Sequence, residues 1–240
     1  MGTIGYQAVN VGERDVRYGY ELLADRIGDS PLPFISANIV DRETQRPIFE
    51  PHVILEAASP DRSRKLRVGV IGAVRFNPVF VQPGPGGKEM VIVHPKDRVR
   101  EELAAVVESG VDVVVLLAAM HQDDARRIAK ENPGIDFVIG SYGGVFSTQR
   151  VEDGRSWILY SGNQGKRLGV TRVFMEPEDG SVLNQQTKLH LMTALYPADP
   201  EMLAWVNAVP VPRPTVPLPA GNPAAVTPAL PSAPGAREGQ

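Results

Sequence analysis

Charged residues gather close to the start of the chain, in a pattern that could bind an anion. Glu13, Arg14, Asp15 and Arg17 follow a short apolar stretch directly. A guanidinium group binds phosphate or carboxylate through two parallel hydrogen bonds, so Arg14 or Arg17 could hold a small anionic ligand. The alternative is a structural ion-pair cluster, with Arg14 paired to Asp15 or Glu13.

A polar, glycine-rich turn over residues 160–165 is a second candidate for ligand contact, through Asn163. A tight connection between two strands explains that turn equally well. Residues 84–88 lack the full GxxxxGK[ST] pattern and a following helix, so we interpret them as a loop and not as a phosphate loop. Ser36 and Ser161 have no His–Asp partners in the pattern, so a serine hydrolase is unsupported.

Composition excludes several classes of function. The 240 residues carry a formal net charge of -3, without the basic excess that nucleic-acid binding needs. The absence of cysteine excludes disulfides, thiolate chemistry, cysteine-bound zinc and iron–sulfur sites, but it does not indicate a compartment. No apolar run is long enough for a transmembrane helix, and no basic segment followed by an apolar stretch marks a signal peptide at the start.

Two regions differ in composition. Residues 1–208 have the pattern of a globular domain, whereas nine of the 22 prolines fall in residues 209–240. Proline removes backbone donors, and this segment offers few large apolar groups to bury, so we predict a disordered Pro/Ala-rich tail biased to polyproline II. A PxxP ligand is the alternative for this tail.

Helices and strands alternate over the first part of the globular region. We predict helices over residues 18–26, 97–109 (capped by Asp97), 123–129 (capped by Asp123) and 200–207. Strands are predicted over residues 34–40, 48–56, 65–74, 113–117 and 137–140. This alternating order favours a mostly parallel arrangement.

The pattern changes after Gly144. Short strands are predicted over residues 145–151, 156–161, 170–175 and 183–191, with turns at residues 152–154 and 178–180. This spacing is typical of an antiparallel meander. Alternating units followed by a strand-rich end indicate a layered α/β sandwich.

Residues 6–19 resemble a signature of the bacterial 5'-nucleotidases, in the calcineurin-like metallophosphoesterase superfamily. The family pattern is Tyr-Asp-Ala-x-x-x-Gly-Asn-His-Glu-x-Asp-x-Gly. Five further segments match the family in order, at residues 34–39, 67–73, 112–117, 136–140 and 165–169. The resemblance covers about residues 1–190 and implies the family's αββα sandwich. It also implies two ligand segments upstream of Met1, so the domain is expected to lack its first strands.

The resemblance implies chemistry by two divalent metal ions, which activate a water molecule and clamp the phosphate. This chain departs from the family at the ligand positions. Glu13 replaces the asparagine and Arg14 the histidine of the first signature, Ala119 replaces a second histidine, and Tyr142 and Gly144 replace two more. Alanine and glycine side chains cannot coordinate a metal, and Arg14 would repel one, so we expect no bound metal.

One histidine could rescue a ligand position. His121 lies two residues beyond Ala119, and strand side chains alternate with a period of two, so both could project to the same side. We prefer to interpret His121 as an exposed loop residue. His52, His94 and His190 are scattered, without the spacing of a metal site.

Two functions therefore stay open. The first is a divergent, non-catalytic domain that binds a small anionic or nucleotide-like ligand, or serves as a scaffold for a protein partner or an upstream segment. The alternative is a fragment of an active phosphoric ester hydrolase that uses a divalent metal of the Mn, Zn or Mg type. Family analogy suggests the periplasm or cell envelope. Missing first strands would leave apolar strand edges open near Val68 and Val113, which predicts low solubility or dimerisation.

Overall fold

The computed structural model describes residues 5–28, 30–59, 64–144, 146–151, 155–176, 178 and 180–208. The chain divides into two compact units, one up to Leu195 and one from Tyr196 onward. Helix α4 (Pro200–Ala208) belongs to the second unit and confirms the helix predicted over residues 200–207. The predicted disordered tail, residues 209–240, lies outside the described residues.

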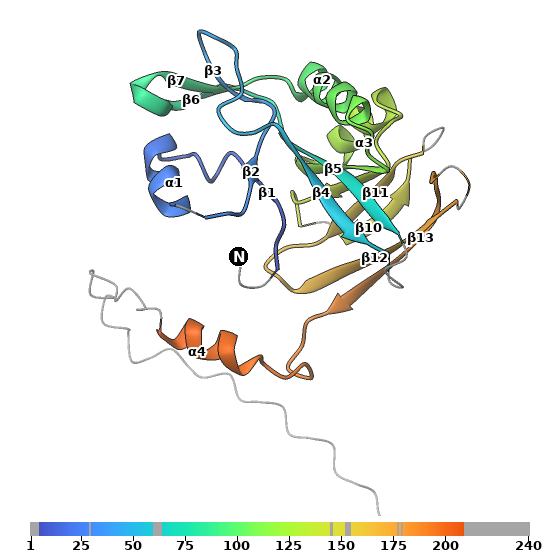
Figure 1. Ribbon diagram of the computed structural model, residues 1–240. Helices are drawn as coiled ribbons and strands as arrows, with labels where there is room; N and C mark the ends of the chain where they lie inside the picture. The colour runs from blue at the N-terminus through green and yellow to red at the C-terminus, as the bar shows by residue number, and fades with distance from the viewer. Residues whose placement is uncertain are drawn as a thin grey trace, which may run out of the picture. The chain divides into compact units, whose positions relative to one another are not determined.

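A six-stranded sheet organises the first unit (Figure 1). Its strands, in spatial order, are β10 (Phe146–Arg150), β11 (Trp157–Ser161), β9 (Phe137–Gly140), β8 (Val113–Ala119), β5 (Lys65–Val74) and β4 (His52–Ala58). The four inner strands run parallel, and the two edge strands are antiparallel to their neighbours. The apolar run of β8 is typical of a parallel strand that is covered on both faces.

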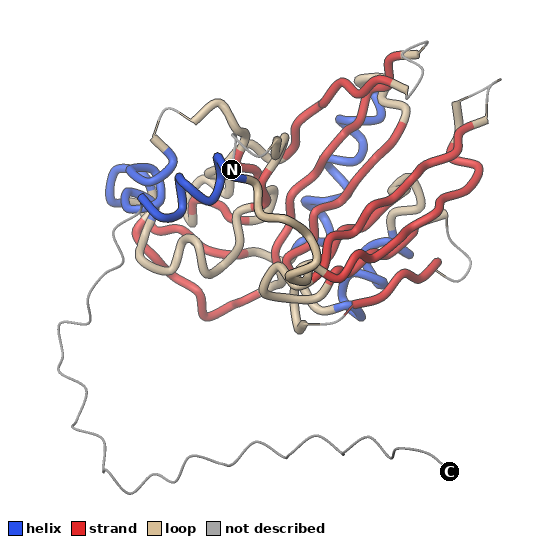
Figure 2. The backbone as a smooth tube through the Cα atoms, turned by 90° about the horizontal axis from the view of Figure 1, so that it is seen from below, coloured by secondary structure: helices blue, strands red, loops and turns tan. Residues whose placement is uncertain are grey.

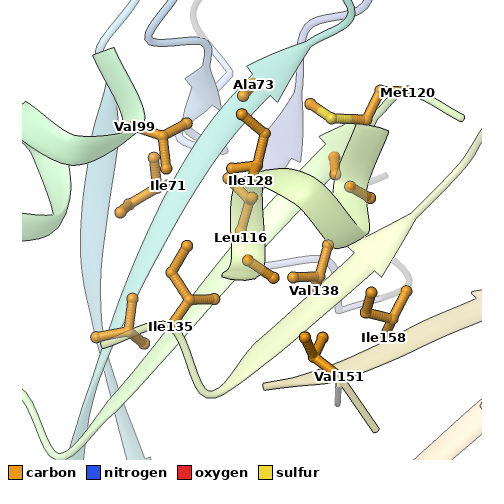
Figure 3. Packing of buried hydrophobic residues seen from close by; sticks show 14 of the residues in the cluster. Ile71, Ala73, Val99, Leu116, Met120, Ile128, Ile135, Val138, Val151 and Ile158 are labelled. Atoms are coloured by element: carbon orange, nitrogen blue, oxygen red, sulfur yellow. The ribbon is translucent and has the colours of Figure 1, made fainter. Parts of the chain in front are cut away.

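Helices α2 (Pro95–Glu108) and α3 (Gln122–Glu131) cover one face of this sheet. Their apolar sides and the facing strand residues form one buried cluster, which includes Ile71, Leu116 and Ile128 (Figure 3). Gly69 permits the close approach of α2, because a Cβ at this position would lie 3.0 Å from the Cβ of Val106.

Among the described residues, three smaller sheets accompany the large one in this unit. β1 (Val9–Asn10) and β2 (Phe34–Ile35) are parallel, and β3 (Ile39–Asp41), β7 (Glu89–Ile92) and β6 (Asn77–Pro83) are antiparallel. The hairpin of β12 (Arg167–Met175) and β13 (Val182–Leu191) lies on the side of the large sheet opposite α2 and α3 (Figures 1 and 2). Helix α1 (Tyr20–Ile27) packs near β6, and a short 3-10 turn, η2 (Pro85–Gly87), precedes β7. The structure is a layered, mixed α/β fold, as the sequence predicts.

The predicted strand over residues 34–40 is interrupted at its centre. Buried Asn38 separates β2 from β3, and its amide donates to the carbonyls of Val74 and Val93 at 2.9 and 2.8 Å. Its Oδ1 also accepts a hydrogen bond from the Val74 N–H. A side chain that takes over backbone hydrogen bonds replaces a sheet ladder locally, which the apolar pattern does not reveal.

Both predicted helix caps are wrong by two or three residues. His94 caps α2, with its Nδ1 accepting from the Lys96 N–H at 3.2 Å, and His121 is the N-cap position of α3. Asp97 and Asp123 lie within the first turns instead. Acidic side chains are stabilised there by the partial positive charge of the helix start, so the same residue type suits both places.

The four strands predicted after Gly144 are confirmed and pair as two antiparallel hairpins, but the single meander predicted for them is wrong. β11 lies between β9 and β10 and pairs with β9 in parallel, and β12 and β13 form a separate hairpin. The predicted turn at residues 152–154 lies outside the described residues.

The expectation of open strand edges near Val68 and Val113 is also wrong. Val68 lies on β5 and Val113 on β8, and each of these strands is paired on both sides. β4 folds back on β5, and β9 covers β8, so the edges of the large sheet are β4 and β10. In the described part of the chain, no helix is long and apolar enough to cross a membrane.

Candidate functional site

A cleft of about 670 Å³ opens where strands β8 and β9 end. In a parallel sheet, the carboxyl ends of neighbouring strands meet at one edge, and ligands bind in the crevice outside them. The lining residues are Gly12, Glu13, Arg14, Asp15, Arg75, Ala119, Ser141, Tyr142, Gly143, Gly144 and Asn163. The fold thus brings together the residues that stand at the family's metal-ligand positions. It also places there two of the three residues predicted to bind a ligand, Arg14 and Asn163.

The segment that follows β1 forms one wall of the cleft. The Asn10 amide anchors it by donating to the Ala73 carbonyl at 2.9 Å. The Gly12 N–H donates to Asp15 Oδ2 at 2.7 Å, and the Asp15 N–H donates back to the Gly12 carbonyl at 3.1 Å. The Asp15 carboxylate therefore closes the turn that presents Glu13 and Arg14 to the cleft.

Glu13 pairs with Arg75, a residue that the sequence pattern did not single out. Its Oε2 lies 3.0 Å from Arg75 Nη2, and its Oε1 accepts a hydrogen bond from the Asn77 amide at 3.1 Å. The side chains of Arg75 and Glu13 are 34% and 29% exposed, so the pair lies at the cleft wall and still reaches solvent. Glu13 thus has two partners, and neither of them is Arg14.

Arg75 is held in place from several sides. It directly follows β5, and its N–H donates to the Ala119 carbonyl at the end of β8, at 3.0 Å. Its guanidinium carbon lies 5.4 Å from the centre of the Tyr142 ring, within the range of a cation–π contact. Its Nε is buried and has no hydrogen-bond partner among the described residues. A cation directly after a buried parallel strand is the signal in the sequence that could have identified it.

The Arg14 side chain, unlike that of Arg75, has no ion-pair partner among the described residues. It is exposed and lines the cleft, and in the described part of the chain neither a hydrogen bond nor an ion pair engages its guanidinium. Arg17 lies outside the cleft lining, and its guanidinium carbon lies 5.8 Å from the centre of the Tyr18 ring. The structure therefore separates the two predicted anion binders, with Arg14 in the cleft and Arg17 outside it.

The opposite wall is the loop after β9. Gly143 and Gly144 have φ values of +81° and +69°, which favour glycine strongly. The Asn163 amide lies close to Gly144, since a Cβ there would be 3.1 Å from Asn163 Nδ2. His121 packs edge-on against Tyr142, with ring centres 4.3 Å apart, and is not one of the lining residues. His121 thus packs against the Tyr142 ring without lining the cleft.

The residues of the cleft do not fit a divalent metal centre. Ala119 and Gly144 offer no donor side chain, and the carboxylates of Glu13 and Asp15 are engaged by Arg75 and by the Gly12 N–H. Among the described residues, no group of three or more His, Cys, Asp or Glu side chains could hold a metal ion. A dinuclear centre needs several carboxylate, amide or imidazole ligands around each ion, and this set supplies too few.

Comparison with known sequences finds relatives of one kind. No family model matches the chain. The 2',3'-cyclic-nucleotide 2'-phosphodiesterase/3'-nucleotidase of Salmonella typhimurium is 25% identical over 151 residues, which are 58% of this chain and 23% of the relative. The protein of the same description from Yersinia enterocolitica is 23% identical over 236 residues, 87% of this chain and 36% of the relative. The chain thus spans about a quarter to a third of these relatives' length.

Solved structures show the same fold. The calcineurin-like phosphoesterase YfkN of Bacillus subtilis superposes with a TM-score of 0.67 at 22% identity, over 85% of this chain and 69% of that one. The 5'-nucleotidase precursor of Thermus thermophilus superposes with a TM-score of 0.66 at 16% identity, over 80% of this chain and 40% of that one.

The layered α/β fold is that of the calcineurin-like phosphoesterases. The sequence relatives and the structural neighbours together support a likeness to the metallophosphoesterases of the 5'-nucleotidase type, which is divergent and covers only part of those proteins. The resemblance predicted from the sequence is confirmed.

Proposed function

We propose that this nucleotidase-like domain is a non-catalytic binder of small phosphate-bearing anions, with the cleft at the strand ends as its site. The observation that carries the proposal is the exposed Arg14 guanidinium, which lines the cleft without a partner among the described residues. A free guanidinium can take two oxygens of one phosphate group through parallel hydrogen bonds. The sequence relatives are described as nucleotidases, which favours a nucleotide-like anion as the ligand.

The residues that line the cleft support binding of a ligand without its hydrolysis. Hydrolysis by this family of folds needs metal ions to generate a hydroxide and to stabilise the phosphoryl group. Here Ala119 and Gly144 stand where imidazoles would be required, and Arg14 and Arg75 add positive charge at the same place. A guanidinium stays protonated at neutral pH, so it can hold an anion but cannot act as a base toward water.

The test is a pair of matched substitutions, with AMP binding measured by calorimetry. Arg14→Gln should weaken binding about tenfold, because a hydrogen bond to a charged group contributes about 1.5 kcal/mol. Arg17→Gln is the control, since Arg17 carries the same charge nearby and lies outside the cleft lining. Equal losses in both variants would show that the effect is general electrostatics and would contradict the assignment of the site.

The alternative, a fragment of a metal-dependent phosphoric ester hydrolase, is tested in parallel. Phosphomonoester turnover is measured with added MnCl₂, and bound metal is measured by elemental analysis of the purified protein. We expect neither turnover nor stoichiometric metal. Clear hydrolysis, or about one equivalent of metal per chain, would overturn the non-catalytic proposal in favour of the hydrolase.

A further inference from the structure

We infer that the Arg75 guanidinium is the fixed cation of the cleft in place of a metal ion, and that Glu13 is its built-in counter-anion, which an incoming phosphate displaces. The inference rests on the proposed function and deepens it. It predicts which side chain competes with the ligand for Arg75, and it makes binding independent of divalent metal.

The first support is the position of Arg75 relative to the departures from the family pattern. Its guanidinium contacts Glu13 at 3.0 Å and the Tyr142 ring at 5.4 Å, and its N–H is bonded to Ala119. These three residues come from three different strand ends, and each stands where the family has a metal ligand. The Arg75 guanidinium thus lies among positions that would otherwise surround a metal ion.

The second support is that the surroundings hold Arg75 without using all of its donors. The backbone hydrogen bond to Ala119 fixes the main chain of Arg75, and the contact with the Tyr142 ring positions its guanidinium. One terminal nitrogen, Nη2, makes the ion pair with Glu13, and a third of the side chain remains exposed at the cleft wall. A guanidinium has five N–H donors in a planar fork, so donors remain for a ligand.

The third support concerns Glu13, which can leave Arg75 without becoming an isolated charge. The Asn77 amide donates to its Oε1 at 3.1 Å, independently of the ion pair. The Glu13 side chain is 29% exposed, so water can replace the lost contact. A phosphate that takes Arg75 therefore displaces a carboxylate that keeps one protein partner, and the exchange breaks no covalent bond.

Two consequences distinguish this arrangement from a merely structural ion pair. Removal of the Glu13 charge should strengthen anion binding, because the internal competitor is gone and the local negative charge is reduced. Removal of the Arg75 charge should weaken it. A structural pair would give the opposite sign for Glu13, since loosening the wall by either substitution would weaken binding.

The experiment measures inorganic phosphate and AMP binding by calorimetry, with EDTA and separately with added MnCl₂. The full chain is compared with Glu13→Gln, Arg75→Gln and Arg75→Lys. A control, Arg42→Gln, removes an exposed arginine that pairs with Glu89 away from the cleft. Circular dichroism and thermal unfolding verify that each variant is folded, and Arg75→Lys keeps the charge if Arg75→Gln unfolds.

We expect equal affinity in EDTA and MnCl₂, about threefold to tenfold tighter binding in Glu13→Gln, and about tenfold weaker binding in Arg75→Gln. Arg75→Lys should fall between the full chain and Arg75→Gln, because lysine keeps the charge without the planar fork. A requirement for MnCl₂, or weaker binding in Glu13→Gln, would overturn the inference. If Arg14→Gln weakens binding while the Arg75 and Glu13 variants bind like the full chain, the inference fails and the proposed function stands.

Discussion

Replacing Gly140 with alanine would disturb the packing that supports the cleft loop. Gly140 ends β9, directly before the loop that carries Tyr142. A Cβ built on Gly140 would lie 1.9 Å from Tyr160 Cζ and 2.3 Å from its Cε2, well inside any tolerable contact. The Tyr160 ring is buried on the same side, and its hydroxyl donates to the Met120 carbonyl at 2.8 Å. The ring cannot move aside without losing that hydrogen bond.

The expected cost follows from these contacts. Overpacking a filled core costs about 1–3 kcal/mol, and leaving a buried hydrogen-bonding group without its partner costs a further 1–3 kcal/mol or so. We therefore expect Gly140→Ala to lower the free energy of unfolding by roughly 3–5 kcal/mol, a large part of the ~5–15 kcal/mol typical of a domain. Burial raises the pKa of Tyr160 to about 12, so its hydroxyl remains a donor at neutral pH.

Urea unfolding of four chains isolates the contact: the wild type, Gly140→Ala, Tyr160→Val and the double variant. With the ring removed, the three atoms nearest to the added Cβ are gone, so the cost of alanine at position 140 should fall below about 1 kcal/mol. Tyr160→Phe is the matched control, since it keeps the ring and loses only the hydroxyl, at about 1–2 kcal/mol. The reasoning is refuted if Gly140→Ala unfolds like the wild type, or costs the same with and without the ring.

Two further predictions concern the buried polar groups of the fold. Burial raises the pKa of Asp136, and the hydrogen bond from the Val114 N–H offsets this only in part, so the folded state holds the proton more tightly than the unfolded state. Stability should therefore fall as pH rises above the ordinary value of 3.8. Thermal melts across that range should show the melting temperature of the wild type falling relative to that of Asp136→Asn. At Gly72, a Cβ would lie 2.7 Å from the Ile35 carbonyl oxygen and 2.8 Å from Asn10 Oδ1. Gly72→Ala should cost roughly 2–4 kcal/mol in urea unfolding and weaken AMP binding, and an unchanged affinity would contradict the role of Asn10 in holding the cleft wall.

Local pattern accounts for the elements that the sequence predicted well. The strand over residues 65–74 was predicted with the bounds that β5 has, because alternating and apolar residues there are flanked by turn signals. β8 was predicted from an uninterrupted apolar run, which suits a strand covered on both faces. Strand β6 was missed because its exposed positions and its two prolines weaken the same signal, and β7 was missed because it is only four residues long.

The sequence by itself determined which chemistry is unsupported at the family's ligand positions. Whether a side chain at position 119 or 144 can coordinate a metal depends on residue type alone, so Ala119 and Gly144 could be interpreted without coordinates. The free energy of a fold depends on many weak apolar contacts, and for that reason the layered α/β class also followed from hydrophobic pattern.

Only the tertiary structure decided which charges meet. Glu13 and Arg75 lie far apart in the chain, and they become partners because β1 and β5 end at the same edge of the fold. Arg14 and Arg17 share a residue type and lie three positions apart, yet only Arg14 lines the cleft. Ion pairing depends steeply on distance and on exposure to water, and the sequence specifies neither quantity before the strands are placed.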